Sequence, residues 1–163
     1  MKNWIELNDK ERRNVWDNFD KKFNFEPSMK KFPSYSPSRP FITYDISSIW
    51  GAIDHEELYF DLETKFLECF KLLTKPNEYF YALDWQHDCY SVNAFLEFPR
   101  DELNRWIIPA IPDGDYYFFI QENFKWGVLT HPWEQTITVF GKEIIEVIKD
   151  NKPKIFHTVL REK

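Results

Sequence analysis

Strand-like segments occur in pairs whose connections are too short for anything except a reversal of chain direction. The pairs are DYYFFI (115–120) with KWGVLT (125–130), and EYFYALDW (78–85) with CYSVNAFLEF (89–98). Antiparallel strands can be joined by a few residues, whereas parallel strands need a crossover of a dozen or more. The spacing therefore predicts two hairpins and an antiparallel sheet.

Two helix starts carry a capping-box pattern, in which a polar N-cap side chain and a glutamate three positions later bond each other's backbone NH groups. The pairs are Asn8 with Glu11, and Asp54 with Glu57. Ile53 and Leu58 flank the second cap as a hydrophobic staple would. Pro27 and Pro76 are expected to end the two helices, because proline cannot continue a helix.

The second of these helices has an apolar stripe with a repeat of three and four residues, which predicts that one face packs on the sheet. Its members are Leu58, Leu62, Phe66, Cys69, Phe70 and Leu73. A third helix is expected over 141–150, with Ile144, Ile145 and Ile148 facing inward. A short helix is expected over 99–107, PRDELNRWI, after a proline suited to a first turn.

Three more segments are expected to form strands, namely 41–46, 136–140 and, at a sheet edge, 154–160. Strands outnumber helices and are arranged in hairpins, which is typical of an α+β fold. We expect a single domain over residues 1–163, a mainly antiparallel sheet with N-terminal, middle and C-terminal helices packed on it. A chain of this length can bury roughly 70% of the surface of its unfolded form.

The segment EPSMKKFPSYSPSRP, residues 26–40, carries four prolines, which exclude a continuous helix or a central strand. It is expected to form a strap or a mobile loop within the domain. Phe32 and Tyr35 are the side chains that would attach it to the body of the protein.

Aromatic residues supply much of the apolar content, with 16 Phe, 8 Tyr and 7 Trp making up 19% of the chain. Only four glycines are present, and the absence of GxGxxG and GxxxxGK[ST] argues against a phosphate-binding loop. The formal net charge of -6 disfavours nucleic acid as a partner, because no basic excess exists to displace counterions. An acidic surface suits a basic protein partner, although mild acidity also serves solubility.

Cys69 and Cys89 are too few for a disulfide framework, and no leader typical of exported proteins opens the chain, so we expect a cytoplasmic location. No run of about 18 apolar residues occurs. A membrane-spanning helix is therefore not expected.

The turn of the first hairpin collects residue types that can bind a metal ion, namely Asp84, His87, Asp88 and Cys89. A metal site needs three or four converging ligands, and the spacings of known zinc sites are missing here. We therefore expect no metal and no other cofactor. Asp84 and Asp88 would cap NH groups of the turn, and His87 would lie in solvent.

A second group lies in THPWEQTITVFGKEI (130–144), where His131 could act as a general base and Glu134 could orient it or act as an acid. No GxSxG motif supplies a nucleophile, and burial of Cys69 on its helix would raise its pKa. Pro132 is suited to a strand entry and Trp133 to a plug between sheet and helix. A structural corner is the favoured interpretation.

Aromatic side chains are numerous enough that some are expected to reach solvent, where Tyr and Trp commonly anchor protein partners. The set is Tyr44, Trp50, Tyr79, Tyr81, Tyr116, Tyr117, Trp126 and Trp133. The alternative is that these side chains are buried in a sheet covered on both faces. DYYFFI supports it, because side chains that would point to either face of the strand are apolar. The residues singled out for binding are Trp50, Glu57, Asp61, Trp126 and Trp133.

The stretches IPDGDYYFFI, WGVLTHPWEQTITVFGKEII and YALDWQHDCY together resemble the bacterial family catalogued as domain of unknown function 2716. The resemblance implies a small stand-alone bacterial protein and supplies no catalytic residues. HPWEQTITVFGKEII is also similar to the strand-to-helix endings of acidic immunity proteins of bacterial toxin systems, which are α+β domains that neutralise a toxin.

Three classes of function remain open. The leading hypothesis is a non-enzymatic, immunity-like protein whose acidic, aromatic surface binds a basic partner such as a toxin domain. One alternative is a small hydrolase-like enzyme with His131, Glu134, Asp84 and His87 in one cleft. The other is a domain that binds a small apolar ligand. The sequence leaves the oligomeric state open.

Overall fold

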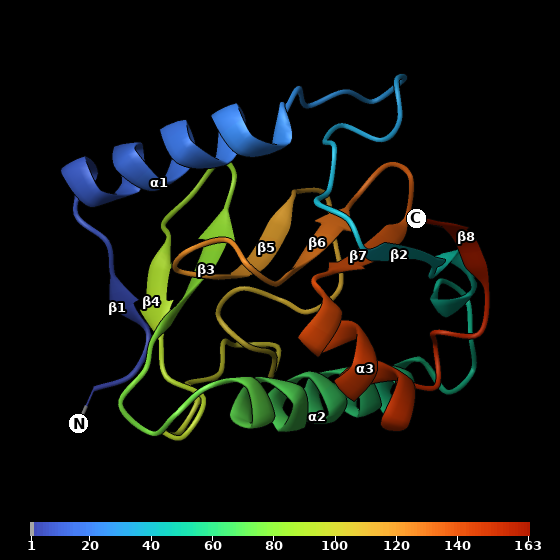
Figure 1. The fold of residues 1–163 in the computed structure, drawn as a ribbon. Coiled ribbons are helices and arrows are strands. Elements are labelled where there is room, and N and C mark those ends of the chain that lie inside the picture. The colour runs from blue at the N-terminus through green and yellow to red at the C-terminus, as the bar shows by residue number, and fades with distance from the viewer. Residues whose placement is uncertain (1) are drawn as a thin grey trace.

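The computed structural model describes residues 2–163 as three α-helices and one eight-stranded sheet (Figure 1). The elements are β1 (Ile5–Glu6), α1 (Asp9–Phe23), β2 (Phe41–Asp45), the 3₁₀ turn η1 (Ser47–Ile49), α2 (His55–Leu73), β3 (Phe80–Asp84), β4 (Tyr90–Val92), β5 (Tyr117–Gln121), β6 (Gly127–His131), β7 (Thr136–Phe140), α3 (Lys142–Asp150) and β8 (Val159–Glu162). The strand order is β1-β4-β3-β5-β6-β7-β2-β8, and every neighbouring pair is antiparallel. The predicted α+β fold is confirmed.

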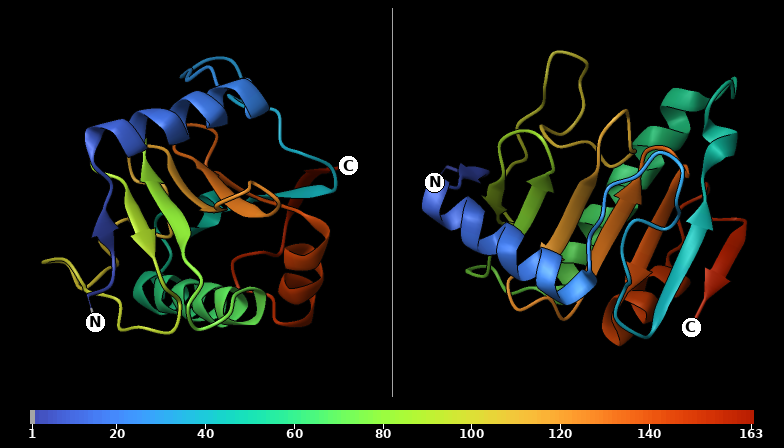
Figure 2. Two further views of the ribbon diagram at one scale, coloured as in Figure 1. Left: turned by 60° about the vertical axis from the view of Figure 1, so that its left-hand side comes forward. Right: turned by 90° about the horizontal axis from the view of Figure 1, so that it is seen from above.

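The sheet is covered on both faces, by α1 on one and by α2 and α3 on the other (Figure 2). The side chains of β5 alternate between these layers. Phe118 stacks on Phe19 of α1, with ring centroids 4.6 Å apart. Phe119, one position on, lies 5.7 Å from Phe70 of α2. The strand has apolar side chains on both of its faces because both faces are buried.

The starts of α1 and α2 differ in whether the residue pattern alone predicts the helix cap. At α1 the Asn8 side chain accepts from Glu11 N at 2.9 Å and Glu11 accepts from Asn8 N at 3.1 Å, so the capping box is confirmed. At α2 the predicted box and staple are wrong, since Asp54 makes no capping bond and Ile53 is fully exposed. The preceding turn leaves Asp54 at ψ 30°, outside the extended conformation that aims an N-cap side chain at the helix.

Both predicted hairpins are confirmed, β3 with β4 and β5 with β6. The β3–β4 hairpin is shorter than predicted. β4 ends at Val92 because the next side chain, Asn93, accepts from the backbone N of Phe95 and turns the chain away. The short helix predicted over 99–107 is also wrong. There the Asp101 carboxylate accepts from the backbone NH groups of Leu103 and Arg105, and this local turn competes with a helix.

The remaining elements match their predictions apart from their bounds. The final helix is confirmed as α3, with Ile144, Ile145 and Ile148 buried. The tail forms the expected edge strand, β8, but begins at Val159 because Phe156 is buried against Tyr44, with ring centroids 4.2 Å apart.

Residues 26–40 contain neither helix nor strand and run across the α1 side of the sheet as a strap (Figure 2). Ser34 and Tyr35 are buried, and the Tyr35 hydroxyl donates to Leu129 O at 3.2 Å. Phe32 is half exposed and meets His131 edge to face. The two aromatic residues thus attach the strap.

No helix among the described residues has the combination of length and hydrophobicity needed to cross a membrane. Cys69 and Cys89 are both free and buried. Burial raises the pKa of Cys69 to about 12, so its thiol is protonated at neutral pH.

We expect Phe19→Ala to lower the free energy of unfolding by about 3 to 5 kcal/mol, because it removes the ring between α1 and β5. Phe60→Ala, at a side chain 63% exposed on α2, is the matched control and should cost less than about 0.5 kcal/mol. Urea unfolding followed by circular dichroism measures both. A loss below about 1 kcal/mol for Phe19→Ala would show that the α1 layer is dispensable.

Candidate functional site

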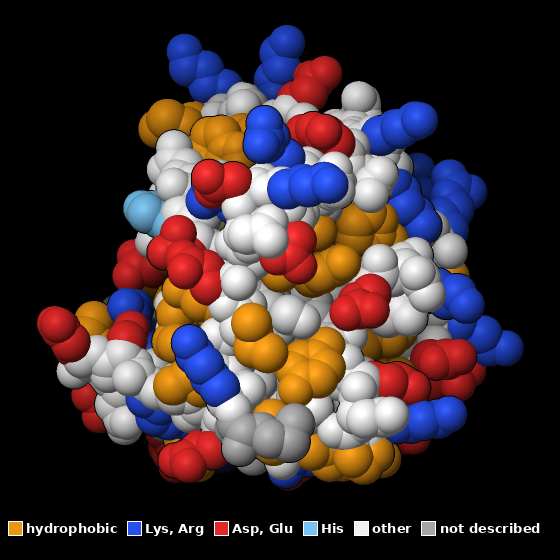
Figure 3. Space-filling model, turned by 90° about the vertical axis from the view of Figure 1, so that its left-hand side faces the viewer, with side chains coloured by type: hydrophobic (Ala, Val, Ile, Leu, Met, Phe, Trp, Pro, Cys, Tyr) orange, Lys and Arg blue, Asp and Glu red, His pale blue; other side chains and the backbone are white. Residues whose placement is uncertain are grey.

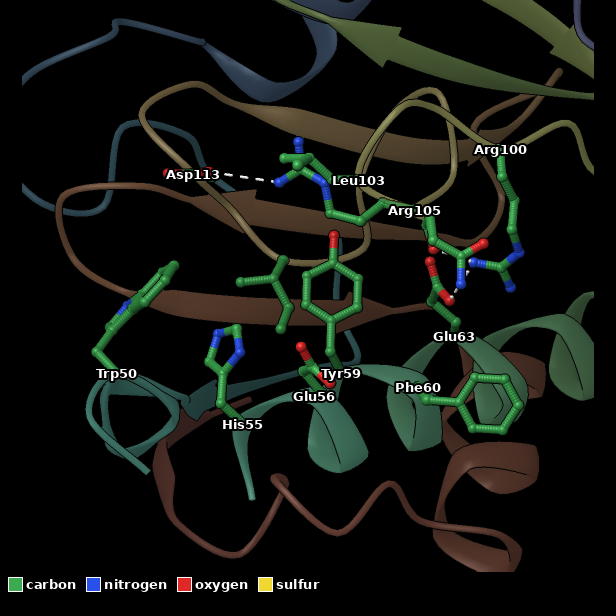
Figure 4. A pocket seen from close by; sticks show the side chains of 12 residues that line it. Trp50, His55, Glu56, Tyr59, Phe60, Glu63, Arg100, Leu103, Arg105 and Asp113 are labelled. Atoms are coloured by element: carbon green, nitrogen blue, oxygen red, sulfur yellow. Dashed lines mark hydrogen bonds and ion pairs between the residues drawn. The ribbon is translucent and has the colours of Figure 1, made fainter. Parts of the chain in front are cut away.

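A cleft of about 520 Å³ lies between α2 and the loop over residues 100–113 (Figure 4). The helical wall consists of His55, Glu56, Tyr59, Phe60 and Glu63. Positions 56, 59, 60 and 63 are three or four residues apart, so their side chains project from one side of the helix. Trp50 closes the cleft at the end where His55 lies (Figure 4).

The loop wall is held on α2 by an ion pair between the buried Glu63 and the partly exposed Arg100. Glu63 is 3% exposed and accepts from Arg100 Nη1 at 3.0 Å and from Trp106 N at 3.2 Å. Burial raises the pKa of Glu63, and the bonds from Arg100 and Trp106 oppose that rise. Removing Arg100 would leave the buried Glu63 carboxylate without its charged partner, so this pair helps to fix the separation of the two walls.

The second arginine of the loop is also paired within the chain. Arg105 lies 3.3 Å from a carboxylate oxygen of Asp101 and 3.4 Å from one of Asp113. Figure 4 shows the Arg105–Asp113 contact at the edge of the cleft, opposite α2. Neither arginine of the cleft is therefore free to neutralise an acidic ligand.

Tyr59 projects from the middle of the helical wall toward the loop (Figure 4). Its hydroxyl is buried and has no hydrogen-bond partner among the described residues. Burial raises the pKa of Tyr59, so the group is a neutral phenol able to donate or accept. A buried hydroxyl without a partner is unusual, and it would be satisfied by a polar group entering the cleft.

The rim of the cleft is apolar and exposed. Trp50, Phe60 and Leu103 are 41%, 63% and 70% exposed. None of the 12 lining residues is a Ser, Thr, Cys or Lys, so a hydroxyl, thiol or amine nucleophile of these types does not line the cleft. This chemistry is suited to binding through apolar contact.

The residues predicted to bind a partner are dispersed by the structure. Trp50 lines the cleft, and Glu57 is exposed on α2 outside it. Asp61 accepts from Lys154 N at 2.7 Å and pairs with Lys65. Trp126 is 4% exposed within the core, so it cannot contact a partner in this conformation, and Trp133 is half-buried against Tyr116.

Half of the eight aromatic residues from which surface-exposed ones were expected are buried in the core. Tyr44, Tyr116, Tyr117 and Trp126 are buried, and Trp50 is the exposed member of that set. Tyr79, Tyr81 and Trp133 are partly buried.

His131 lies at the end of β6 with no exposed surface. Its Nε2 is 2.8 Å from Ser34 Oγ, and its Nδ1 accepts from Glu134 N at 3.1 Å. Burial lowers the pKa of His131 to about 4, so the ring is neutral at pH 7. These contacts join the corner between β6 and β7 to the strap.

The Glu134 carboxylate makes no hydrogen bond with the His131 ring among the described residues and is held by Arg161 of β8. The two guanidinium contacts measure 2.7 and 2.8 Å, and Thr136 Oγ1 donates to the same carboxylate at 2.8 Å. Burial alone would raise the pKa of Glu134, but the bonds from Arg161 and Thr136 lower it. Glu134 therefore links the corner to the edge strand.

The other predicted pair, Asp84 and His87, lies in a separate cluster that contains a residue the sequence did not indicate. His87 Nδ1 is 3.1 Å from Asp84 Oδ1 and 3.3 Å from Asp115 Oδ2. Burial and the neighbouring Asp84 raise the pKa of Asp115 to about 7, and Asp84 raises the pKa of His87. Within residues 2–163 no hydrogen bond or ion pair joins this cluster to His131 or Glu134, and none of the four residues lines the cleft.

Sequence reasoning missed the cleft because its walls are brought together by tertiary packing. One signal was present, since Glu63 lies next to Leu62 in the apolar stripe of α2 and three residues before Phe66. A carboxylate at such a position indicates a buried partner, which is Arg100 here. No comparable signal marks Asp115, which precedes a strand as an ordinary turn residue does.

The surface charge is mixed rather than uniformly acidic on the side that carries β1. Figure 3 shows lysines and arginines interspersed with acidic side chains there, with hydrophobic side chains between them. A preference for a basic partner would therefore have to arise from a local group of charges.

The fold is that of a small α+β protein with an eight-stranded antiparallel sheet. The chain belongs to the family described as a protein of unknown function, DUF2716, whose model matches residues 6–145. It is 38% identical over 160 residues to the uncharacterized protein YxiI of Bacillus subtilis (strain 168), an alignment that covers 96% of this chain and 98% of that protein. No solved structure shows a significant match. The predicted family is confirmed, and the description of neither match mentions toxin immunity.

The buried His131 generates a pH prediction. Its pKa is about 4 in the folded protein and about 6.5 in an unfolded chain, so between these values the unfolded state binds more protons. Stability is therefore lost as the pH falls from about 6.5 toward 4, by about 2 to 3 kcal/mol from this residue. His131→Gln should therefore reduce the difference in unfolding free energy between pH 7 and about pH 4.5 by about 2 to 3 kcal/mol.

Urea unfolding of the wild-type protein and the variant at the two pH values measures this difference. His157→Gln, at an exposed position, is the control and should leave it unchanged. Equal pH dependence in the wild type and His131→Gln would show that the histidine is not held neutral.

Proposed function

We propose that this protein is a non-enzymatic binding protein of the bacterial cytoplasm, and that the cleft between α2 and the 100–113 loop binds a basic segment of a protein partner. The observation that carries the proposal is the exposed apolar rim of Trp50, Phe60 and Leu103 around a cleft with an excess of acidic groups. A large exposed aromatic and aliphatic group of this kind commonly marks a protein-binding surface.

The charges around the rim favour a basic partner. Arg100 and Arg105 are paired with acidic groups of the chain itself. Glu56 lines the cleft, and Glu57 and Glu102 lie outside it, each next in sequence to a lining residue; all three are exposed and form no ion pair with another described residue. A partner that brings lysine or arginine would meet these carboxylates, whereas an acidic partner would be repelled.

A lysine or arginine side chain also fits the interior of the cleft. Its aliphatic stem would pack on Phe60 and Leu103, and its charged group could donate to the unpartnered hydroxyl of Tyr59. The indole of Trp50 at the end of the cleft adds a ring face that attracts cations.

The two free cysteines support a reducing compartment, since disulfides form and persist in oxidising ones. A basic toxin domain is one partner of the required chemistry. The proposal itself is for a basic protein segment with an apolar anchor.

Selection of peptides from a displayed random library tests this proposal. Peptides enriched on the wild-type protein should combine lysine or arginine with a bulky apolar residue, and the double variant Phe60→Ser/Leu103→Ser should lose them. For a selected peptide, fluorescence anisotropy should show a Kd raised by at least about tenfold in the double variant, because two apolar contacts are removed.

Leu72→Ser is the matched control, since this side chain is on α2 and 73% exposed but lies outside the cleft. It should change the Kd by less than about twofold. Enrichment of acidic peptides, equal selection on the double variant, or no enrichment at all would contradict the proposal.

A further inference from the structure

The group Asp84, His87 and Asp115 brings three potential ligand atoms together at one end of the sheet. Asp84 is the last residue of β3, and Asp115 lies just before β5, the strand beside it. His87 is in the turn between β3 and β4. One ligand atom from each residue lies within 4.8 Å of the other two.

Asp115 provides an independent indication that a ligand belongs there. Its side chain is 6% exposed, and its Oδ1 accepts from the backbone N of Tyr116 at 2.7 Å. Oδ2 is buried, is directed into the group and meets no hydrogen-bond donor in good geometry among the described residues, and its contact there is with His87 Nδ1 at 3.3 Å. A buried carboxylate oxygen without a donor is costly, and a cation between Asp115, Asp84 and His87 would remove that cost.

The distances agree with a shared ion. His87 Nδ1 lies 3.1 Å from Asp84 Oδ1 and 3.3 Å from Asp115 Oδ2. Two ligand atoms that are each about 2.1 Å from an ion and this far apart subtend an angle of about 100°, which lies within the range of tetrahedral and octahedral coordination.

The ligand types select the class of ion. Two carboxylates and one imidazole suit first-row transition ions, whereas Ca²⁺ takes six to eight oxygen ligands and Mg²⁺ prefers oxygen and water. The His87 side chain is 70% exposed, so the remaining coordination positions would face solvent and hold water.

We propose that Asp84, His87 and Asp115 bind a divalent first-row transition-metal ion, with Zn²⁺ the best match, in a site that is separate from the cleft. The site would connect the β3–β4 turn to the start of β5. It replaces our expectation, drawn from ligand spacing alone, that this turn binds no metal.

Second-sphere contacts support the arrangement. Asp84 Oδ1 accepts from the backbone N of Gln86 at 3.1 Å, and Asp115 is oriented by Tyr116 N. Groups that orient metal ligands in this way commonly raise affinity by 10- to 100-fold.

Calorimetric titration of the chelator-treated, full-length protein with ZnCl₂ tests the proposal. The expected result is one Zn²⁺ per chain, with binding weakened by at least about tenfold in both Asp115→Asn and His87→Gln. Asp88→Asn is the matched control, because Asp88 is in the same turn but outside the group, and it should change the Kd by less than about twofold. Millimolar CaCl₂ or MgCl₂ should not displace the Zn²⁺.

His87→Gln keeps the test decisive if Asp115→Asn fails to fold, since His87 is an exposed turn residue. MnCl₂ gives a second measurement, because the paramagnetic ion should broaden amide NMR signals around residues 84–87 and 115 first. The proposal is overturned if no Zn²⁺ binds, or if His87→Gln binds Zn²⁺ as the wild type does, which would mean that other histidines such as His55 or His157 hold it.

Discussion

The burial of β5 on both faces is the constraint on which the rest of the structure depends. Phe118 contacts rings of α1 and of the strap, including Phe19 and Tyr35. Phe119, on the opposite face, contacts Phe70 of α2 and Trp106 of the long loop between β4 and β5. Segments without regular structure are therefore needed as covers, because helices alone leave part of the sheet exposed.

The helices and loops that pack on the sheet carry buried polar groups, and these groups are of two kinds. Glu63 and His131 have hydrogen-bond partners that account for their burial, in Arg100 and in Ser34. Tyr59 and Asp115 each retain a buried oxygen that forms no hydrogen bond with the described residues, although His87 Nδ1 lies 3.3 Å from that of Asp115. Because such atoms are rare in folded proteins, they separate positions that maintain the fold from positions suited to a ligand.

Features of the fold that depend on residues close together in the sequence were predicted better than features that depend on residues far apart. The α1 capping box is local and was predicted, and the apolar side chains on both faces of β5 are a local pattern that kept a sheet covered on both sides open as an alternative. The helix over 99–107 was predicted from apolar spacing, but the Asp101 carboxylate stabilises a turn there through backbone bonds that spacing does not reveal. For α2, the preceding turn set the backbone of Asp54, so a correct residue pattern gave the wrong cap.

The candidate sites were less predictable than the fold because their residues come from segments far apart in the chain. Asp115 joins Asp84 and His87 only once β5 has paired with β3, a register that no single-strand pattern specifies. The cleft likewise needs Arg100 to reach Glu63 across 37 positions of sequence.

The cleft and the metal-binding group meet in one short segment, which limits how each can be altered alone. Asp113 pairs with Arg105 at the cleft, and Asp115 lies in the group, with Gly114 between them at φ 80°. A side chain with a Cβ is strained at that φ, so a substitution of Gly114 would disturb both sites together. Phe60 and His87 lie outside this segment, on α2 and in the β3–β4 turn. Changes at those two positions therefore distinguish a binding protein that also holds a metal from one in which either feature exists by itself.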